Sequence, residues 1–198
     1  MSEPQTTQAP APTRKRVAVI GAGVSGLAAG RAFKARGHDV TILERAQDLG
    51  GVWDPARSYP EVQTQSPKDL YRYTSKPMPD AFPEWPKGPQ VHAYLSEFAA
   101  ENALGDLIRY GTAVETMARR EDGAPGWTLT LKDDAGQREE SYDFVAVCTG
   151  QFSEKNRLAH PGMEAFEAAG GRVLHSSEYN DAGAVKDRDV VVLGFSKS

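Results

Sequence analysis

The sequence predicts an α/β fold built on a parallel β-sheet, and three neighbouring segments carry that prediction. Residues 17–20 are an apolar stretch that runs directly into a glycine-rich turn. Residues 27–36 are rich in helix-forming residues, and Gly37 closes them. Residues 39–43, with Val40, Ile42 and Leu43, have a composition typical of a buried strand. A strand, a helix and a strand in this order form one βαβ unit, whose two strands run parallel.

The turn after the first strand contains glycines at a spacing that suits a dinucleotide. Gly21 permits a tight turn, Gly23 lets the backbone approach a diphosphate, and Gly26 lets the helix pack closely on the sheet. The N-terminus of the helix then offers free N–H groups and the positive end of its dipole to an anion. The predicted fold is therefore Rossmann-like, with Val24 and Ser25 as further candidate contacts of the dinucleotide.

An acidic residue follows the second strand. Glu44 lies 23 positions after Gly21, close to the spacing of about 20 at which a carboxylate binds a ribose hydroxyl. Because a carboxylate would repel a 2′-phosphate, the site favours FAD or NAD over NADP. Arg45 is a further candidate contact beside it. The alternative is a glycine-rich turn that binds no ligand.

Two further segments are candidate cofactor contacts. Residues 51–53 combine a glycine, which permits close backbone approach, with an indole that offers a flat apolar surface. Residues 144–148 are continuously apolar and predict a strand that is buried on both faces of the sheet. Thr149 and Gly150 end this strand, and small residues there would let backbone come close to a ligand at the carboxyl edge.

The middle of the chain contains a long loop, a helix and a group of strands. Residues 54–90 carry most of the prolines and predict an irregular, aromatic-rich loop. From Val91 apolar residues recur at helical spacing, so we expect a helix that ends near Gly105. Residues 107–142 contain short alternating stretches and turns, which predict an inserted β-meander.

A second phosphate-binding turn begins near the end of the sequence. Residues 189–193, apolar after Asp189, predict another strand, which enters a turn containing Gly194. Ser196 stands where the middle glycine usually lies, and Ser198 is the next candidate contact. A turn of this kind needs a following helix for its dipole, so we expect the second site to be incomplete within these residues.

Composition limits the partners and the compartment. Lys and Arg number 23 against 27 Asp and Glu, a net charge of −4, which gives no reason to expect nucleic acid or an anionic membrane as partner. The single cysteine, Cys148, excludes an internal disulfide or a dithiol redox pair and fits a reducing compartment. Without an apolar membrane span or signal peptide, a cytoplasmic protein is expected. None of the four histidines has a metal-ligand partner at useful spacing, so no metal is expected.

Two nucleotide motifs, joined by Gly-Gly-Val-Trp, Cys-Thr-Gly and His-Ser-Ser-Glu-Tyr, resemble the flavin-containing monooxygenases, the class B flavoprotein monooxygenases that use FAD and NADPH. The resemblance covers about residues 16–198, the N-terminal portion of such an enzyme. It implies that the first motif binds FAD through its pyrophosphate and that the second begins an NADPH site. The FAD contacts that the resemblance implies are Gly21, Gly23, Ser25, Gly26, Glu44, Gly51, Val52, Trp53 and Val114.

The resemblance also implies a division of the chain. We expect a disordered tail over residues 1–15, an FAD-binding domain over 16–170 and the start of an NADPH-binding domain over 171–198. The tail is polar and proline-rich, which prevents it from burying apolar surface.

A reaction follows from the same resemblance. In the family, NADPH reduces FAD, the reduced flavin takes up O₂ to form a 4a-hydroperoxyflavin, and one oxygen passes to an amine nitrogen or a sulfide sulfur. The family signature Phe-x-Gly-x-x-x-His-x-x-x-Tyr is similar to residues 169–179, with Ala169 in the Phe position. Tyr179, where Baeyer–Villiger relatives tend to have Trp, favours N- or S-oxygenation of small molecules. Gln65 stands where the family has Asn near the reactive flavin edge, and it is the candidate catalytic residue.

Three functions remain open at this point. The first is the FAD-binding part of an NADPH- and O₂-dependent monooxygenase. The second is a catalytically incomplete flavin-binding module or truncated fragment. The third is a flavin disulfide reductase, against which the lack of a cysteine pair argues. The sequence leaves the oligomeric state open and is compatible with a homo-oligomer.

Overall fold

The computed structural model describes residues 13–151 and 154–194. Most of the tail that we expected over residues 1–15, and two candidate NADPH contacts, Ser196 and Ser198, lie outside these described residues.

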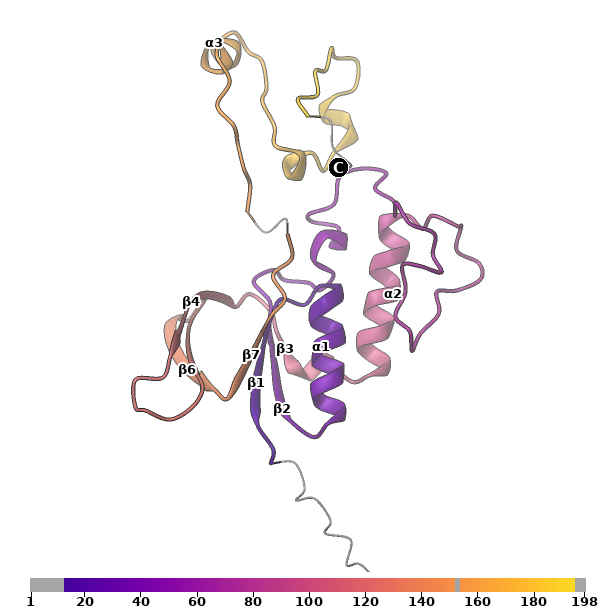
Figure 1. Cartoon of the computed structure of the whole chain (residues 1–198). Coiled ribbons are helices and arrows are strands. Elements are labelled where there is room, and N and C mark those ends of the chain that lie inside the picture. The colour runs from indigo at the N-terminus through magenta and orange to yellow at the C-terminus, as the bar shows by residue number, and fades with distance from the viewer. Residues whose placement is uncertain (1–12, 152–153, 195–198) are drawn as a thin grey trace, which may run out of the picture.

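A four-stranded parallel sheet forms the centre of the molecule (Figure 1). Its strands are β1 (Arg16–Ile20), β2 (Asp39–Leu43), β3 (Ile108–Arg109) and β7 (Phe144–Val147), in the order β3-β2-β1-β7. All three pairings are parallel. The βαβ unit and the parallel sheet predicted from the sequence are confirmed.

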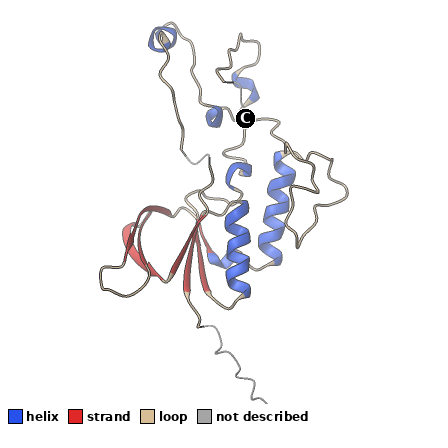
Figure 2. Cartoon of the chain, in the orientation of Figure 1, coloured by secondary structure: helices blue, strands red, loops and turns tan. Residues whose placement is uncertain are grey.

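Two helices cover one face of this sheet (Figure 2). These are α1 (Val24–Ala35) and α2 (Gly88–Glu101). The second begins three residues before Val91, because Pro89 lies in its first turn, where the missing N–H costs no hydrogen bond. Between the helices and the sheet lies the larger core, which includes Val17, Val19, Leu27, Ile42, Val91, Leu95 and Phe98.

The other face carries the predicted β-meander, but only over residues 113–142. The expectation that it begins at residue 107 is wrong, because Ile108 and Arg109 form β3, which pairs in parallel with β2. Its strands β4 (Ala113–Arg119), β5 (Trp127–Asp133) and β6 (Gly136–Tyr142) form an antiparallel sheet of three. Its inward side chains form a second core with the parallel sheet, made of Ala18, Leu43, Leu129, Leu131 and Tyr142. The period-two alternation in β5 therefore places Leu129 and Leu131 at full burial.

The long proline-rich loop connects β2 to α2. Apart from the single-turn helix η1 (Gly51–Trp53), it consists of turns, bends and isolated bridges. Lys68 fixes its far end, because Nζ donates hydrogen bonds to the carbonyl oxygens of Pro79, Asp80 and Phe82 at 3.1, 3.0 and 3.0 Å. The loop is thus ordered by its own polar contacts.

The prediction that residues 144–148 form a strand buried on both faces is wrong in its burial. Among the described strands, β7 pairs only with β1, and it lies at the edge of the sheet. Phe144 and Val147 are 54% and 59% exposed. Apolar composition made the stretch a strand, but its position at an edge leaves one side of it in solvent.

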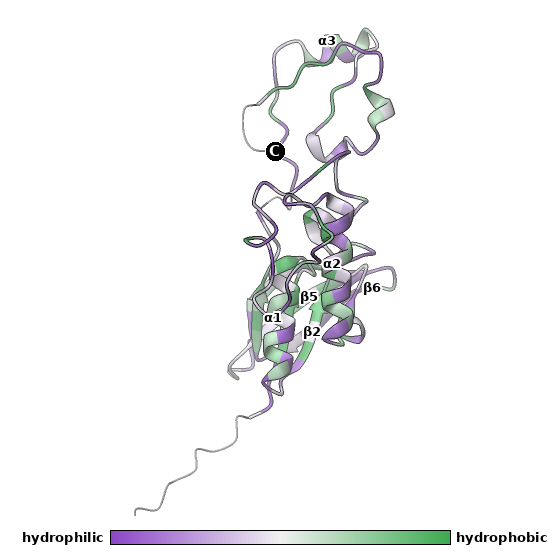
Figure 3. Cartoon of the chain, turned by 90° about the vertical axis from the view of Figure 1, so that its right-hand side faces the viewer, coloured by the Kyte–Doolittle hydropathy of each residue, from purple (hydrophilic) through white to green (hydrophobic). Residues whose placement is uncertain are grey.

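The segment after β7 leaves the three-layered part of the molecule, which consists of the two helices, the parallel sheet and the meander (Figure 1). Its only regular elements among the described residues are α3 (Met163–Ala168) and two single-turn helices, η3 (Ser176–Glu178) and η4 (Ala182–Ala184). Figure 3 shows apolar stretches in this outlying segment as well as in the core.

The strand predicted over residues 189–193 is not formed. Val191 is 83% exposed, and Val190, Val192 and Leu193 are exposed too. No described strand lies beside this stretch to accept its hydrogen bonds, and a β-strand is stable only when it is paired. Within the described residues, no helix is long and apolar enough to span a bilayer.

Candidate functional site

The glycine turn lies where three strands of the parallel sheet end. Gly21 follows β1 with φ +103°, and its N–H donates to the carbonyl oxygen of Leu43 at 2.8 Å. A Cβ at this position would lie 2.6 Å from the carbonyl oxygen of Cys148. Both the dihedral angle and the lack of space therefore require glycine.

The N-terminus of α1 is open toward this turn. Gly23 is the N-cap residue in extended backbone, and no described side chain caps the helix. The first turn contains no acidic residue. The first N–H groups of a helix have no acceptor within it, so those of the first turn, from Val24 to Gly26, are available to an anion.

Gly26 brings α1 against the turn and the sheet. A Cβ here would lie 1.8 Å from the carbonyl oxygen of Gly21 and 3.6 Å from Cβ of Cys148. One turn further along, a Cβ on Gly30 would lie 2.6 Å from Cδ1 of Ile42. The close packing that the sequence predicted for Gly26 is confirmed, and Gly30 extends it.

Glu44 lies beside the turn and is buried, with 6% of the residue exposed. One carboxylate oxygen accepts a hydrogen bond from the N–H of Ala22 at 2.7 Å, and the other accepts from the N–H of Ala46 at 2.9 Å. Each oxygen keeps a second lone pair with which it could accept from a ribose hydroxyl. Glu44 therefore holds the glycine turn in place, a role that spacing alone did not predict.

A second glycine segment packs against the first. The N–H of Gly50 donates to the carbonyl oxygen of Ala22 at 3.0 Å, and a Cβ on Gly51 would lie 3.3 Å from Cα of Gly23. Val52 is 48% exposed. The indole of Trp53, by contrast, is buried in the larger core, and its Nε1 donates to the hydroxyl of Tyr71 at 2.8 Å. Of this segment, the backbone of Gly51 and the side chain of Val52 form open surface beside the turn.

The other candidate contacts are spread more widely. Thr149 and Gly150 are exposed just after β7, at the carboxyl edge as expected. Arg45 pairs with Glu154 at 2.8 Å, which ties the end of β2 to the chain after β7. Val114 is half-buried in β4 against the second core.

Gly194 and Gln65 lie in irregular segments. Gly194 ends the described part of the outlying segment and is exposed. Gln65 is exposed on the proline-rich loop. Cys148 packs against the larger core, and burial raises the pKa of its thiol, which fits an inert side chain. Within the described residues, no three His, Cys, Asp or Glu side chains gather closely enough to hold a metal ion.

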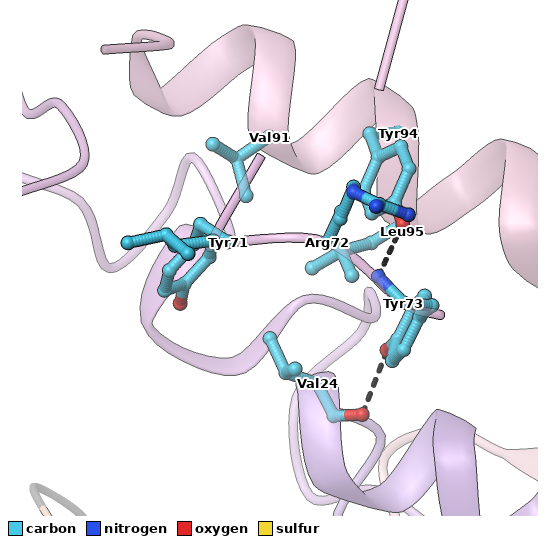
Figure 4. Close-up of a pocket in the computed structure, with 8 residues that line it drawn as sticks. Val24, Tyr71, Arg72, Tyr73, Val91, Tyr94 and Leu95 are labelled. Atoms are coloured by element: carbon cyan, nitrogen blue, oxygen red, sulfur yellow. Dashed lines mark hydrogen bonds between the residues drawn. The ribbon is translucent and has the colours of Figure 1, made fainter. Parts of the chain in front are cut away.

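Tyr73 joins the proline-rich loop to the N-terminal turn of α1 (Figure 4). Its hydroxyl donates to the carbonyl oxygen of Val24 at 2.7 Å, and its N–H donates to the hydroxyl of Tyr94 at 2.7 Å. Tyr94 in turn donates to the carbonyl oxygen of Lys76 at 2.7 Å. Burial raises the pKa of Tyr73 well above its usual value, so the phenol keeps its proton. The aromatic content of the loop was the only sequence signal for this contact, and it did not identify the partner.

Replacing Tyr73 by phenylalanine is expected to destabilise the protein by about 1 kcal/mol, because the Val24 carbonyl loses a hydrogen-bond donor. The urea midpoint measures the loss. Tyr110→Phe is the matched control, since no hydrogen bond of the Tyr110 hydroxyl occurs within the described residues. Equal midpoints for the two variants would contradict the role given to Tyr73.

His175 caps a turn in the outlying segment. Its Nδ1 accepts from the N–H of Ser177, and its own N–H donates to the carboxylate of Glu178 at 2.8 Å. Glu178 also pairs with Lys155 at 3.0 Å and Arg157 at 2.5 Å. The backbone hydrogen bond from His175 and these two cations lower the pKa of Glu178 to about 2. The motif from His175 to Tyr179 is thus held to residues 155–157 through one carboxylate.

This capped turn is expected to open only in strong acid. Because the pKa of Glu178 is depressed from 4.5 to about 2, its contribution is complete above pH 4.5 and is lost as the pH falls through 2. The amide resonance of His175 should therefore titrate with a midpoint near 2. A midpoint near 4.5 would show that these contacts do not form in solution.

The fold and its glycine turn define the class. A parallel sheet whose first strand ends in a glycine turn, followed by an uncapped helix and a carboxylate after the second strand, is a Rossmann-like dinucleotide-binding architecture. The family follows from sequence: the model of the flavin-binding monooxygenase-like family matches residues 14–198, and the chain belongs to that family.

Relatives agree with this assignment. Flavin-containing monooxygenase 3 of Macaca mulatta is 33% identical over 196 residues, which cover 93% of this chain and 36% of the relative. Flavin-containing monooxygenase FMO GS-OX-like 4 of Arabidopsis thaliana is 33% identical over 215 residues, covering 92% of this chain and 46% of the relative. The chain therefore spans less than half the length of these relatives.

Solved structures share the fold. S-allyl-L-cysteine S-oxygenase from Allium sativum has a TM-score of 0.66 at 26% identity, over 77% of this chain and 40% of that one. An oxidized steroid monooxygenase bound to NADP has a TM-score of 0.65 at 31% identity, over 77% of this chain and 29% of that one.

Proposed function

We propose that this chain is the FAD-binding part of an NADPH- and O₂-dependent monooxygenase that oxygenates nitrogen or sulfur atoms of small molecules. The observation that carries the proposal is the uncapped N-terminus of α1, which lies beside a turn that has no side chains at Gly21, Gly23 and Gly26. A diphosphate is the ligand that such a corner suits. The Allium sativum relative is named as an S-oxygenase, which supports a soft sulfur nucleophile as acceptor.

The residues present fit FAD. The N–H groups of residues 23–26 would bind its diphosphate, and Glu44 would accept from the hydroxyls of the adenosine ribose. The buried carboxylate of Glu44 disfavours a 2′-phosphate, so this first site selects FAD over NADP. Gly51, Val52, Val114, Thr149 and Gly150 line the surroundings as further contacts in this proposal.

When bound, the flavin supplies electron transfer from NADPH to O₂, of which one oxygen atom enters the acceptor and the other leaves as water. The residues of this chain bind the cofactor and orient it. The N-terminus of α1 fixes the diphosphate, Tyr73 and Lys68 hold the loop that carries Gln65, and Gln65 lies on that loop as the residue proposed at the reactive edge.

The remaining proposals concern organisation. We assign residues 16–170 to the FAD-binding domain and 171–198 to the start of an NADPH-binding domain, in which Gly194, Ser196 and Ser198 contribute. The expected partners are a small-molecule substrate and O₂, and the single cysteine supports a cytoplasmic location.

Two spectroscopic readings test the function. Purified protein titrated with FAD should retain a yellow, protein-bound flavin. Because residues 171–198 supply only the start of the proposed NADPH site, NADPH added under argon should bleach this flavin slowly, whereas dithionite should bleach it at once. Colour without bleaching would favour a flavin-binding module that lacks the reductive half-reaction. If the protein stayed colourless at saturating FAD, the proposal would be wrong.

A further inference from the structure

The proline-rich loop contains an open cavity, and most of the residues that line it have no role in the proposed FAD site. It has a volume of about 600 Å³ and is lined by Tyr59, Glu61, Gln63, Thr64, Gln65, Trp85 and Lys87. Of these residues, only Gln65 has been given a role above. The lining is mostly polar, with two aromatic rings, so the cavity suits a small polar ligand rather than an apolar one.

Two segments of the loop run side by side and form this cavity. The N–H of Thr64 donates to the carbonyl oxygen of Pro86 at 2.9 Å, and the N–H of Gly88 donates to that of Val62 at 2.7 Å. Gln63 and Lys87 form an antiparallel bridge between them. Glu61 begins the first segment with φ 60°, a left-handed conformation that is unfavourable for a residue with a side chain. The backbone contacts hold this strained residue in place.

A carboxylate and an ammonium lie next to each other at the cavity. Nζ of Lys87 is 2.8 Å from Oε2 of Glu61, and both side chains are largely exposed. The hydrogen bond from Lys87 lowers the pKa of Glu61, so the Glu61 carboxylate is charged at neutral pH. An exposed pair of this kind is weak, so a ligand can separate it at little cost.

Two further side chains at the cavity, those of Trp85 and Thr64, lack contacts that a bound ligand could provide. The indole of Trp85 is 45% exposed at the cavity, although a ring of this size is usually well buried. The hydroxyl oxygen of Thr64 is buried and has no hydrogen-bond partner within the described residues. Most buried polar atoms in folded proteins are hydrogen-bonded, so this hydroxyl is an independent sign that something is missing here.

The adjacent charges decide which ligand fits. A simple cation attracted to Glu61 would be repelled by Lys87, and a simple anion attracted to Lys87 would be repelled by Glu61. A molecule that carries an ammonium and a carboxylate on one carbon satisfies both. We propose that this cavity binds a small α-amino acid, with its ammonium on Glu61, its carboxylate on Lys87 and its side chain on the indole of Trp85. The amino acid would also be the oxygen acceptor, through a sulfur atom in its side chain. This second role rests on the proposed function.

Three probes that share one methylthio side chain test the charge requirement. S-methyl-L-cysteine carries both charges, 2-(methylthio)ethylamine only the positive one, and 3-(methylthio)propionate only the negative one. Each is titrated into the full chain saturated with FAD, and the Nε1–H resonances of the three tryptophans are followed by NMR. Trp127, on β5, is the internal control because it stacks with Arg119 at 4.1 Å and lies outside the cavity.

The resonance of Trp85 should shift saturably with S-methyl-L-cysteine at a concentration at least about tenfold lower than with either singly charged probe. The Trp127 resonance should stay in place. Lys87→Met should abolish the preference for the zwitterion over the amine, whereas Lys132→Met on the meander should preserve it. Equal affinity for all three probes, no shift of Trp85, or equal shifts of Trp85 and Trp127 would each overturn the proposal.

The same samples separate this inference from the proposed function. If flavin is bound but S-methyl-L-cysteine leaves Trp85 unchanged, the amino-acid site is wrong and the flavin proposal stands. If apoprotein binds the amino acid with the expected preference but takes up no FAD, the binding site stands and its role as the oxygen-acceptor site is overturned.

Discussion

Gly26→Ala is expected to destabilise the protein by at least about 3 kcal/mol, because α1 cannot keep its place on the sheet. The added Cβ would lie 1.8 Å from the carbonyl oxygen of Gly21. That atom belongs to the backbone of the turn, so no side-chain rotation relieves the contact. The helix must move away from β1, which opens the larger core around Leu27.

Thermal or urea unfolding measures this loss. Gly105→Ala is the matched control, since a Cβ there meets nothing within 4 Å. The Gly26 variant should unfold at a much lower urea concentration than wild type, while the control stays close to it. If both variants unfolded like the wild type, α1 would not pack on the turn as described.

Gly23→Ala is expected to leave the fold intact and weaken FAD binding about 100-fold, equivalent to about 2.7 kcal/mol. Gly23 has ordinary negative φ, and a Cβ there would lie 3.7 Å from Cα of Gly51, a normal contact. The protein therefore has room for the methyl group. A diphosphate bound against the N-terminus of α1 does not, because the methyl group occupies its path.

The comparison of two readouts makes this variant informative. Unfolding should be unchanged, and the titration of FAD, followed by flavin fluorescence, should show the loss. Full retention of FAD by Gly23→Ala would place the flavin elsewhere on the molecule. A large drop in stability would instead show that the turn tolerates a side chain less well than its geometry indicates.

Local sequence predicted the features that depend on neighbours in the chain. The glycine spacing between Gly21 and Gly26 predicted the turn between β1 and α1, because at both positions a side chain would collide with nearby backbone atoms. The alternation of Leu129 and Leu131 with polar residues predicted a strand with one buried face, because successive side chains of a strand point to opposite faces. The family model then matched almost the whole chain.

Contacts between distant residues were not predictable in this way. Tyr73 meets the Val24 carbonyl across 49 positions, and the Ala22 N–H meets Glu44 across 22. Spacing indicated a ribose role for Glu44 but not its hold on the turn. Residues 189–193 have the composition of a strand and yet form none, because pairing depends on a neighbour and not on composition.

The backbone amide resonances of Gly23, Val24 and Ser25, followed during an FAD titration, test the central claim most directly. The account predicts that these three shift together and saturate with the bound flavin, while amides of the meander, such as that of Thr130, stay in place. If FAD bound and these resonances did not move, the diphosphate would not lie at the N-terminus of α1, and the account would be contradicted.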